Sequence, residues 1–201
     1  MLQEEKIKYE RELYEAGYRY ICGVDEVGRG PLAGPVVCAA VIMPLEALLD
    51  GVDDSKKVPL KKRENLASLI QKNAIALNIC RVEPDIIDEI NILEATKLCM
   101  KRAVEGLTVA PDFVLSDGNM KLDISIPQRS LIKGDALSYS IGAASIAAKV
   151  YRDALMDDYA KEFPEYVFER NKGYGTREHI EAIKKFGLCA VHRRSFTGKW
   201  V

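Results

Sequence analysis

Residues 20–44, YICGVDEVGRGPLAGPVVCAAVIMP, hold two apolar segments joined by a glycine-rich connection. The segments 20–27 and 34–44 are short, rich in β-branched residues and bounded by glycine or proline, a pattern typical of neighbouring strands. Asp25 and Glu26 end the first segment, directly before the glycines. This stretch therefore predicts the start of a sheet with two adjacent carboxylates at the end of a strand.

Strands and helices alternate along the rest of the chain. Short apolar runs predict further strands at 76–82, 113–118 and 129–135. Apolar residues at helical spacing, or abundant small residues, predict helices at 59–73, 138–163 and 177–186, and one or two helices within 84–107. Strands that first cluster and then alternate with helices indicate an α/β domain with a mixed central sheet.

The domain organisation follows from length and from the first residues. The chain has 201 residues, of which 48% are hydrophobic, and this fits one main domain with a terminal appendage. Within residues 2–17, Leu2, Ile7, Leu13 and Tyr14 stand among charged residues at roughly helical spacing, which predicts a short amphipathic helix. We therefore divide the chain into an N-terminal helical segment, 1–19, and a main domain, 20–201, onto which that segment packs.

Cysteine usage and hydropathy exclude several classes of protein. The five cysteines are scattered without a CxxC pair, which indicates reduced thiols and neither a zinc site nor a disulfide framework. The N-terminus is charged throughout, and no stretch approaches the roughly 18 uncharged residues of a membrane span. We therefore expect a soluble, cytoplasmic protein that does not associate with membranes.

Charge is unevenly distributed, although the formal net charge is only -1. Residues 170–201 contain eight basic and two acidic residues, so this tail carries +6 and the remainder -7. A second basic run comprises Lys56, Lys57, Lys61, Lys62 and Arg63. These runs are either solvated helix faces or contacts for a polyanion, and the second interpretation gains weight if acidic residues elsewhere form a metal site.

Four carboxylates are placed where they could form such a site. Adjacent carboxylates at the end of an apolar strand are costly to desolvate unless a cation neutralises them, although an exposed strand end would also satisfy Asp25 and Glu26. Asp117 and Asp135 also follow apolar runs, at the strand ends where open α/β sheets collect ligands. Oxygen donors without competing cysteine or histidine favour Mg²⁺ or Mn²⁺. Asp25 and Glu26 can share a site only if the strand twists or bulges, because neighbouring side chains point to opposite faces.

The glycine cluster at 28–33 has the spacing GxGxxA, but a dinucleotide-binding turn requires a helix directly after it, and here a strand is expected. Gly28 and Gly30 instead offer exposed backbone groups, which in a nucleic-acid enzyme could read a ribose 2'-hydroxyl. His179 and His192 could serve metal-free acid-base chemistry, but packing is the more usual role for two histidines placed in this way.

Seven motifs in a fixed order now carry a resemblance to a known family. They are CGVDEVGRGPLAGPVV (22–37), DDSKK (53–57), SDGN (116–119), KGD (133–135), ASIAAKVYRD (144–153), KGYGT (172–176) and HRRSF (192–196). Together they resemble bacterial ribonuclease HII, from about Tyr20 to near the end of the chain. The sister family, ribonuclease HIII, usually has threonine where this chain has Arg29, and it carries a longer N-terminal extension.

The resemblance implies an RNase H-like fold, a mixed five-stranded sheet flanked by helices, with a C-terminal helical part from about residue 155. It implies that four carboxylates are catalytic and hold Mg²⁺ or Mn²⁺: Asp25, Glu26, Asp117 and Asp135. It assigns ribose reading to the loop Gly28, Arg29 and Gly30, and junction sensing to Tyr174. It assigns phosphate contact or structural support to Lys56, Lys57, Arg193 and Arg194. A structural role is expected for Asp153.

The activity implied is endonucleolytic hydrolysis of RNA in RNA/DNA hybrids, and cleavage 5' to single ribonucleotides embedded in duplex DNA. Two metal ions would act on the scissile phosphate, with water as the nucleophile, leaving 5'-phosphate and 3'-hydroxyl ends. We expect a monomer. Two alternatives stay open: a non-catalytic hybrid-binding protein of the same fold, and a DNA nuclease or resolvase with the same metal chemistry.

Overall fold

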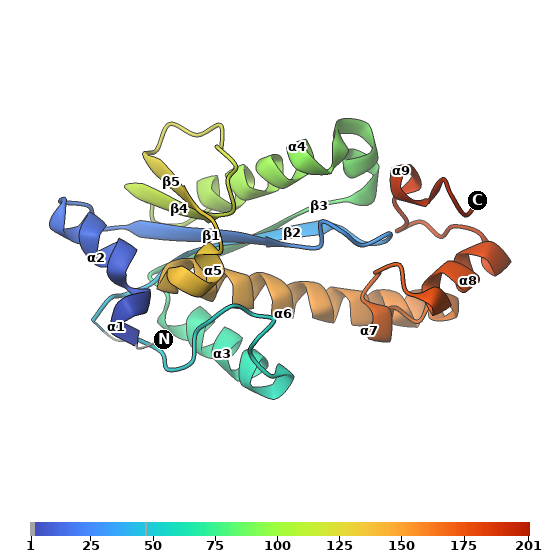
Figure 1. The fold of residues 1–201 in the computed structure, drawn as a ribbon, viewed down its shortest axis with the longest axis horizontal. Coiled ribbons are helices and arrows are strands. Elements are labelled where there is room, and N and C mark those ends of the chain that lie inside the picture. Colours follow the sequence, from blue (N-terminus) through green and yellow to red (C-terminus); the bar gives the residue numbers. More distant parts are fainter. Residues whose placement is uncertain (1–2, 47) are drawn as a thin grey trace.

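A mixed five-stranded sheet forms the middle layer of the protein, in a computed structural model that describes residues 3–46 and 48–201 (Figure 1). Its strands are β1 (Ile21–Val27), β2 (Val36–Ile42), β3 (Ala76–Val82), β4 (Phe113–Asp117) and β5 (Gln128–Leu131). Their order is β3-β2-β1-β4-β5. The first three strands are antiparallel neighbours, whereas β4 and β5 extend the sheet in parallel with β1. The mixed sheet expected from the sequence is confirmed.

Helices cover both faces of the sheet (Figure 1). Helix α4 packs on one face, and α6 with α3 packs on the other. The helices are α1 (Gln3–Lys6), α2 (Lys8–Glu15), α3 (Leu60–Asn73), α4 (Pro84–Glu105), α5 (Gly134–Leu137), α6 (Tyr139–Glu162), α7 (Phe168–Asn171), α8 (Arg177–Phe186) and α9 (Arg194–Thr197), with a 3-10 turn at Pro164–Tyr166. None of the helices in the described residues is long and apolar enough to cross a membrane.

The core has one layer on each side of β2. Alternate residues of this strand, such as Cys38 and Val41, belong to different apolar clusters, and all seven residues are buried. Burial on both faces explains why the segment is apolar throughout, without alternating polar positions. On β1, Gly23 allows α6 to lie directly on the strand, because a Cβ atom there would come within 2.1 Å of the Ser140 carbonyl carbon.

One of the predicted strands differs from the structure. The strand expected at 129–135 ends at Leu131, because Lys133 adopts the left-handed conformation at φ 60° and a helical turn begins at Gly134. Asp135 therefore stands in α5 and not at the end of a strand. Within 84–107 the helix is kinked at Asn91, whose φ is 68° and whose Oδ1 accepts the Leu93 N–H. The prediction of one or two helices in this segment agrees with the kink.

The N-terminal segment packs on the main domain, as expected. Two short helices replace the single predicted one, and Leu2 lies outside the described residues. Lys6 donates to the Val52 carbonyl at 2.8 Å, and the buried Glu10 carboxylate accepts the Ser138 hydroxyl. Because these contacts join the segment firmly to the rest, the division into 1–19 and 20–201 stays a prediction.

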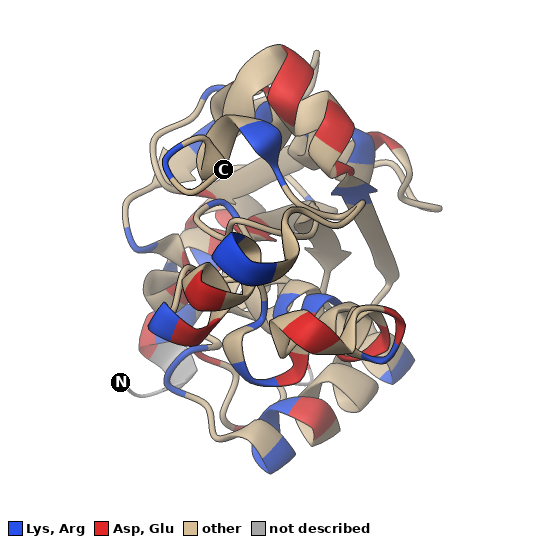
Figure 2. Cartoon of the chain, turned by 90° about the vertical axis from the view of Figure 1, so that its right-hand side faces the viewer, with Lys and Arg blue, Asp and Glu red and all other residues tan. Residues whose placement is uncertain are grey.

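The C-terminal segment forms a small cluster of its own at the end of α6. Its buried apolar residues are Leu32, Ala33, Met156, Tyr166, Phe168, Ala182, Ile183 and Val191. Acidic and basic residues are interspersed on this end of the molecule (Figure 2). Arg170 pairs with Glu178, and Lys172 pairs with Asp157. The tail is therefore not one continuous basic face, although its sequence carries +6.

Candidate metal centre and substrate surface

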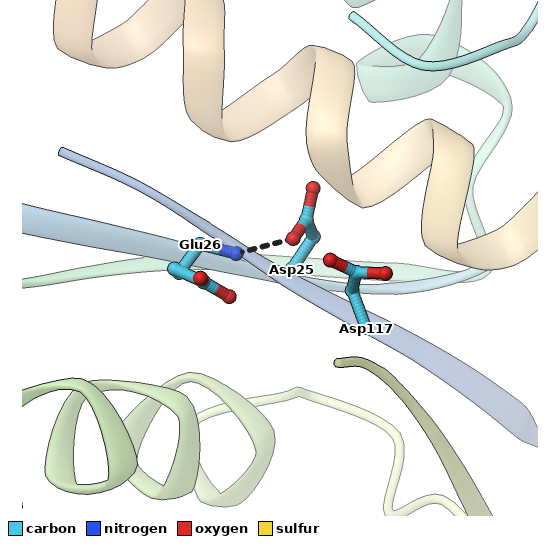
Figure 3. A group of neighbouring side chains, drawn as sticks. All are labelled: Asp25, Glu26 and Asp117. Atoms are coloured by element: carbon cyan, nitrogen blue, oxygen red, sulfur yellow. Dashed lines mark hydrogen bonds between the residues drawn. The ribbon is translucent and has the colours of Figure 1, made fainter. Parts of the chain in front are cut away.

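Three carboxylates converge where β1 and β4 end (Figure 3). The parallel pairing of these strands runs to Val24 opposite Ser116, so the residues that follow, Asp25 and Asp117, lie side by side just beyond the end of that pairing. Glu26 joins them, and one oxygen from each of the three lies within 4.8 Å of the others. Three of the four carboxylates expected from the sequence are therefore brought together.

Asp25 and Glu26 share this centre without a break in the pairing of β1 with β2. The register continues through Asp25 opposite Ala39 and Glu26 opposite Cys38. The two side chains leave the strand on opposite sides, Asp25 toward α6 (Figure 3). Asp25 Oδ1 then accepts the Glu26 backbone N–H at 2.7 Å. Because β1 has no partner on its β4 side beyond Val24, both carboxylates can approach Asp117 around that open edge.

The centre carries more negative charge than its surroundings neutralise. Asp25 is only 5% exposed, and burial together with repulsion from Glu26 and Asp117 raises its pKa well above the usual value. Burial also raises the pKa of Glu26, although Arg29 at 3.5 Å opposes this effect. Within residues 3–46 and 48–201, Arg29 is the one cation that forms an ion pair with the three carboxylates.

These residues fit a hard divalent cation. Glu26 Oε2 is buried and has no hydrogen-bond partner in the part of the chain that the structure describes. Asp117 is held in place by the Gly134 N–H, which donates to its Oδ1 at 2.6 Å. Clustered anionic oxygens with an unsatisfied acceptor and no cysteine or histidine are the donor set that Mg²⁺ and Mn²⁺ prefer.

Asp135 lies at the rim of the centre and is not one of the converging three. It is half-buried, and its Oδ1 accepts the Ala136 N–H at 2.9 Å. Burial raises its pKa, with further contributions from Asp117 and Asp54, so it faces the same region of negative potential. Our placement of Asp135 at a strand end was wrong, because the chain turns into α5 before it.

Sequence reasoning missed two residues beside the centre. Asp54 contributes to the potential at Asp135, and the Ser145 hydroxyl near Asp25 lowers the pKa of that carboxyl. The Ser145 and Ser55 hydroxyls also lie within hydrogen-bond distance, 3.0 Å apart, which joins α6 to the loop at 53–57. A polar residue in an alanine-rich buried helix was the available signal for Ser145.

Lys56 and Lys57 lie on the same loop, with exposed side chains. Lys56 is close enough to Asp135 to lower the pKa of that carboxyl. Lys57 Nζ is 3.8 Å from Asp54 Oδ2, and the Lys56 N–H donates to Asp54 Oδ1. Both lysines are therefore on the solvent side of the acidic centre.

The glycine loop after β1 rests on two buried arginines. Arg193 is fully buried and donates to the carbonyls of Gly28, Arg29 and Gly34 at 2.5–2.9 Å. Arg152 is also fully buried, and its donors reach Ala33, Pro35 and Lys172. Burial lowers the pKa of Arg193 to about 9 and that of Arg152 to about 10, so both are charged at neutral pH.

This arrangement corrects our expectation for Arg193. Its guanidinium faces the interior beneath the loop, so it supports the loop and does not reach a phosphate. Arg194, the next residue, is exposed. Gly28 requires its small size, because its φ is +92° and a Cβ atom would come within 2.2 Å of Arg152 Nε. Arg29 itself is 43% exposed in its side chain.

Tyr174 is exposed and lies next to the glycine loop. Its ring carbon Cε1 is 3.7 Å from the position that a Cβ atom would take at Gly30. Internal hydrogen bonds hold the turn that carries Tyr174. The Tyr174 N–H donates to the Asn171 carbonyl, and the Thr176 N–H donates to the Tyr174 carbonyl at 2.8 Å.

His179 and His192 are both buried in the C-terminal cluster. Their Nε2 atoms lie 3.0 Å apart, and their rings contact those of Tyr166 and Phe168. Asp153, on α6, pairs with Lys149 and Arg63. These contacts agree with packing or structural roles for the three residues and give no support to metal-free acid-base catalysis.

A mixed sheet in this order, with carboxylates converging at the ends of β1 and β4, defines a metal-dependent nuclease with an RNase H-like fold. Comparison with known proteins gives the family. The profile of the family described as Ribonuclease HII matches residues 22–199. The ribonuclease HII of Syntrophus aciditrophicus is 53% identical over 191 residues, which are 95% of this chain and 90% of that protein. That of Acetivibrio thermocellus is 53% identical over 96% of this chain and 75% of its own length.

A solved structure agrees with the sequence relatives. The ribonuclease H2 of Pyrococcus horikoshii OT3 superimposes with a TM-score of 0.76 at 26% identity, over 90% of this chain and 96% of that one. The chain belongs to the ribonuclease HII family, and it is a metal-dependent endoribonuclease.

Proposed function

We propose that this enzyme hydrolyses the RNA strand of RNA/DNA hybrids and cuts on the 5' side of single ribonucleotides embedded in duplex DNA, leaving 5'-phosphate and 3'-hydroxyl ends. The observation that carries the proposal is the placement of the acidic centre beside the glycine loop. Glu26, at the end of β1, pairs with Arg29 of that loop, and Gly30 lies against the ring of Tyr174. Carboxylates for metal and groups for substrate thus form one continuous surface.

The carboxylates of Asp25, Glu26 and Asp117 would hold two divalent ions, Mg²⁺ or Mn²⁺, with Asp135 contributing from the rim. Such ions stabilise negative charge on the attacking and leaving oxygens of the phosphodiester. The protein contributes fixed positions for the oxygens that hold them. Asp117 is oriented by the Gly134 N–H, and Asp25 by the Glu26 N–H.

Residues 28–30 read the ribose. Arg193 engages the carbonyls of Gly28 and Arg29, which turns these acceptors inward. The backbone N–H groups of Arg29 and Gly30 make no hydrogen bond to any part of the chain that the structure describes, so they remain available to a 2'-hydroxyl. A hydroxyl both accepts and donates, and it is the local mark that separates RNA from DNA.

Tyr174 senses the junction between the ribonucleotide and the following DNA. Its exposed ring adjoins Gly30, so a sugar that follows the ribonucleotide held by the loop would lie against it. Lys56, Lys57 and Arg194 are exposed cations placed to contact phosphates of the duplex. We further propose that the enzyme acts as a monomer in the cytoplasm.

The test is cleavage of three labelled duplexes in Mg²⁺ or Mn²⁺: one with a single ribonucleotide, a uniform hybrid, and an all-DNA control. The expected result is cutting of the first two and not the third, with a cut immediately 5' of the single ribonucleotide and ligatable 5'-phosphate ends. Asp25→Asn serves as the matched inactive protein. Equal cutting of all-DNA would indicate a DNA nuclease. Binding of hybrids by the wild-type protein without metal-dependent cutting would indicate a non-catalytic protein.

A further inference from the structure

The C-terminal cluster contains a chain of hydrogen bonds that ends on Tyr174. The Cys189 N–H contacts His192 Nδ1 at 3.0 Å. His192 Nε2 lies 3.0 Å from His179 Nε2, and His179 Nδ1 lies 2.9 Å from the Tyr174 carbonyl oxygen. Both histidines are buried, at 4% and 0% exposure, so water does not substitute for these partners.

The direction of the chain is fixed by the chemistry of its ends. A neutral imidazole has one donor and one acceptor nitrogen. His192 Nδ1 must accept, because the backbone amide of Cys189 can only donate, and therefore His192 Nε2 carries the proton. His192 Nε2–H donates to His179 Nε2, so the proton of the neutral His179 is on Nδ1, where it donates to the Tyr174 carbonyl. The two end links, to the Cys189 amide and to the Tyr174 carbonyl, thus fix both tautomers, and Cys189 Sγ, 3.0 Å from His192 Nδ1, agrees with them because a protonated thiol can donate to that nitrogen.

The surroundings keep both imidazoles neutral. Burial lowers the pKa of His179, and burial together with His179 lowers that of His192 to about 4. A second proton would set two N–H groups against each other at the 3.0 Å contact. The neighbouring Cys189 thiol keeps its proton because burial raises its pKa to about 11, and the Tyr166 hydroxyl donates to the Gly187 carbonyl.

The end point of the chain controls the orientation of Tyr174. Its carbonyl accepts two hydrogen bonds, from Thr176 N–H and from His179 Nδ1–H, which fixes the peptide plane that follows it. On the other side, Gly173 has φ +83° and lies against the Ala33 carbonyl, since a Cβ atom there would be 2.4 Å from that oxygen. The exposed ring is thus carried by a main chain that is held from both sides.

We propose that His179 is a positioning residue for Tyr174, that His192 sets the tautomer of His179, and that the resulting hydrogen bond to the Tyr174 carbonyl sets the preference for an isolated ribonucleotide over a uniform hybrid. This inference rests on the junction role of Tyr174 proposed above. A pair of apolar side chains could fill the same volume, but it would leave the Tyr174 carbonyl with the Thr176 bond alone. The histidines therefore do more than pack.

Two substitutions at His179 separate the hydrogen bond from the packing. The amide of Asn places its donor near the position of Nδ1, so His179→Asn can still bond the Tyr174 carbonyl. The longer Gln places its polar atoms near Nε2, so His179→Gln keeps the His192 contact and loses that carbonyl. The measurement is kcat/KM on the single-ribonucleotide duplex divided by kcat/KM on the uniform hybrid. The ratio should fall about three- to tenfold in His179→Gln, the effect of one hydrogen bond, and stay within about twofold of wild type in His179→Asn.

Ile183→Val is the matched control, because Ile183 is buried in the same cluster one helical turn from His179. It should lower the melting temperature and leave the ratio unchanged. Equal ratios in the Gln and Asn variants, or a similar fall in Ile183→Val, would overturn the inference. If Tyr174→Ala leaves the ratio unchanged, the junction role itself fails; if Tyr174→Ala lowers it and His179→Gln does not, only the histidine inference fails.

Nitrogen-15 NMR of the wild-type enzyme tests the same chain without any substitution. The inference requires the proton on Nδ1 of His179, the less common tautomer, and on Nε2 of His192. Since this measurement needs only the folded protein, it can refute the hydrogen-bond chain even if the His179 variants do not fold. The opposite tautomer at either residue, or a charged imidazole at neutral pH, would overturn the proposal.

Discussion

Two adjacent arginines in the C-terminal segment should respond to substitution in opposite ways. Arg193 is fully buried and donates four hydrogen bonds to three main-chain carbonyls, whereas Arg194 is exposed. The backbone N–H of Arg194 donates to the Asp88 carboxylate, and an alanine at this position would keep that hydrogen bond. Arg193→Ala should therefore damage the fold of the glycine loop, and Arg194→Ala should affect only the contact with substrate.

The magnitude for Arg193 follows from the carbonyls that it leaves behind. Each buried acceptor without a partner costs about 1–3 kcal/mol, and water entering the vacated space would keep each cost near the lower end. Three carbonyls give a loss of about 3–5 kcal/mol in the free energy of unfolding. For Arg194→Ala we expect a change within about 0.5 kcal/mol, because it is an exposed side chain.

Urea unfolding in the absence of metal measures the first effect. Duplex binding by proteins that also carry Asp25→Asn measures the second: the slope of log K against log salt should become shallower by roughly 0.9 in Arg194→Ala, which is one phosphate contact. Arg193→Lys is the control, since it keeps the charge but lacks the planar fork that serves three carbonyls. If Arg193→Ala is as stable as wild type and has a shallower salt slope, the reasoning is refuted, and Arg193 contacts a phosphate of the duplex.

Three further outcomes are expected. Asp25→Asn should abolish turnover, and turnover above a few per cent of the wild-type rate would contradict this. In chelator, the variant should be no less stable than wild type, because the substitution removes a buried charge that Glu26 and Asp117 repel. It should also lose the stabilisation of about 3 kcal/mol that saturating metal gives the wild-type fold. Tyr174→Ala should slow cleavage at a single ribonucleotide roughly ten- to hundredfold and cleavage of a uniform hybrid less, with little change in melting temperature; equal slowing would remove the junction role. The pKa of His192 is lowered to about 4 in the folded protein, so as the pH falls the imidazole takes up a proton in the unfolded chain before it does so in the folded one. The contribution of the neutral His192 to the free energy of unfolding is therefore complete above pH 6.5 and is lost as the pH falls toward 4. Urea unfolding at pH 7 and pH 5 should show a loss of about 2 kcal/mol in wild type relative to His192→Gln, and parallel behaviour of the two proteins would argue against it.

Local sequence patterns predicted most of the strands and helices and the three converging carboxylates of the metal centre, Asp25, Glu26 and Asp117. β2 is apolar throughout and β1 is apolar up to Val24 because both faces of the sheet are covered, and that pattern is visible in the sequence. Asp25 and Glu26 stand out because two charges terminate such a strand. Asp117 could be added because it ends a second apolar run, and the parallel pairing of β1 with β4 brings the two ends together.

The rest depends on contacts between distant segments. Nothing in the motif HRRSF indicates that the first arginine points inward and the second outward, since the difference arises only when residues 28–34 pack against the tail. The prediction that Asp135 lies at a strand end was wrong because Lys133 adopts the left-handed conformation and the strand ends before it. Lysine rarely adopts this conformation, so the sequence gives no sign of it. The charge count of the tail likewise overlooked ion pairs such as Arg170 with Glu178.

The support of the glycine loop by Arg193 has a consequence for how the enzyme is assembled. Its hydrogen bonds join residues 159–165 positions apart, whereas β1, which supplies Asp25 and Glu26, pairs with β2 as a near neighbour in the chain. Long-range contacts form late because closing a long loop is entropically costly. A folding chain should therefore pass through a stage with paired strands and an unsupported loop. Ribose discrimination would be acquired only in the final step, and hydrogen exchange at Gly34, whose N–H donates to the Val191 carbonyl at 2.8 Å, should report when it happens.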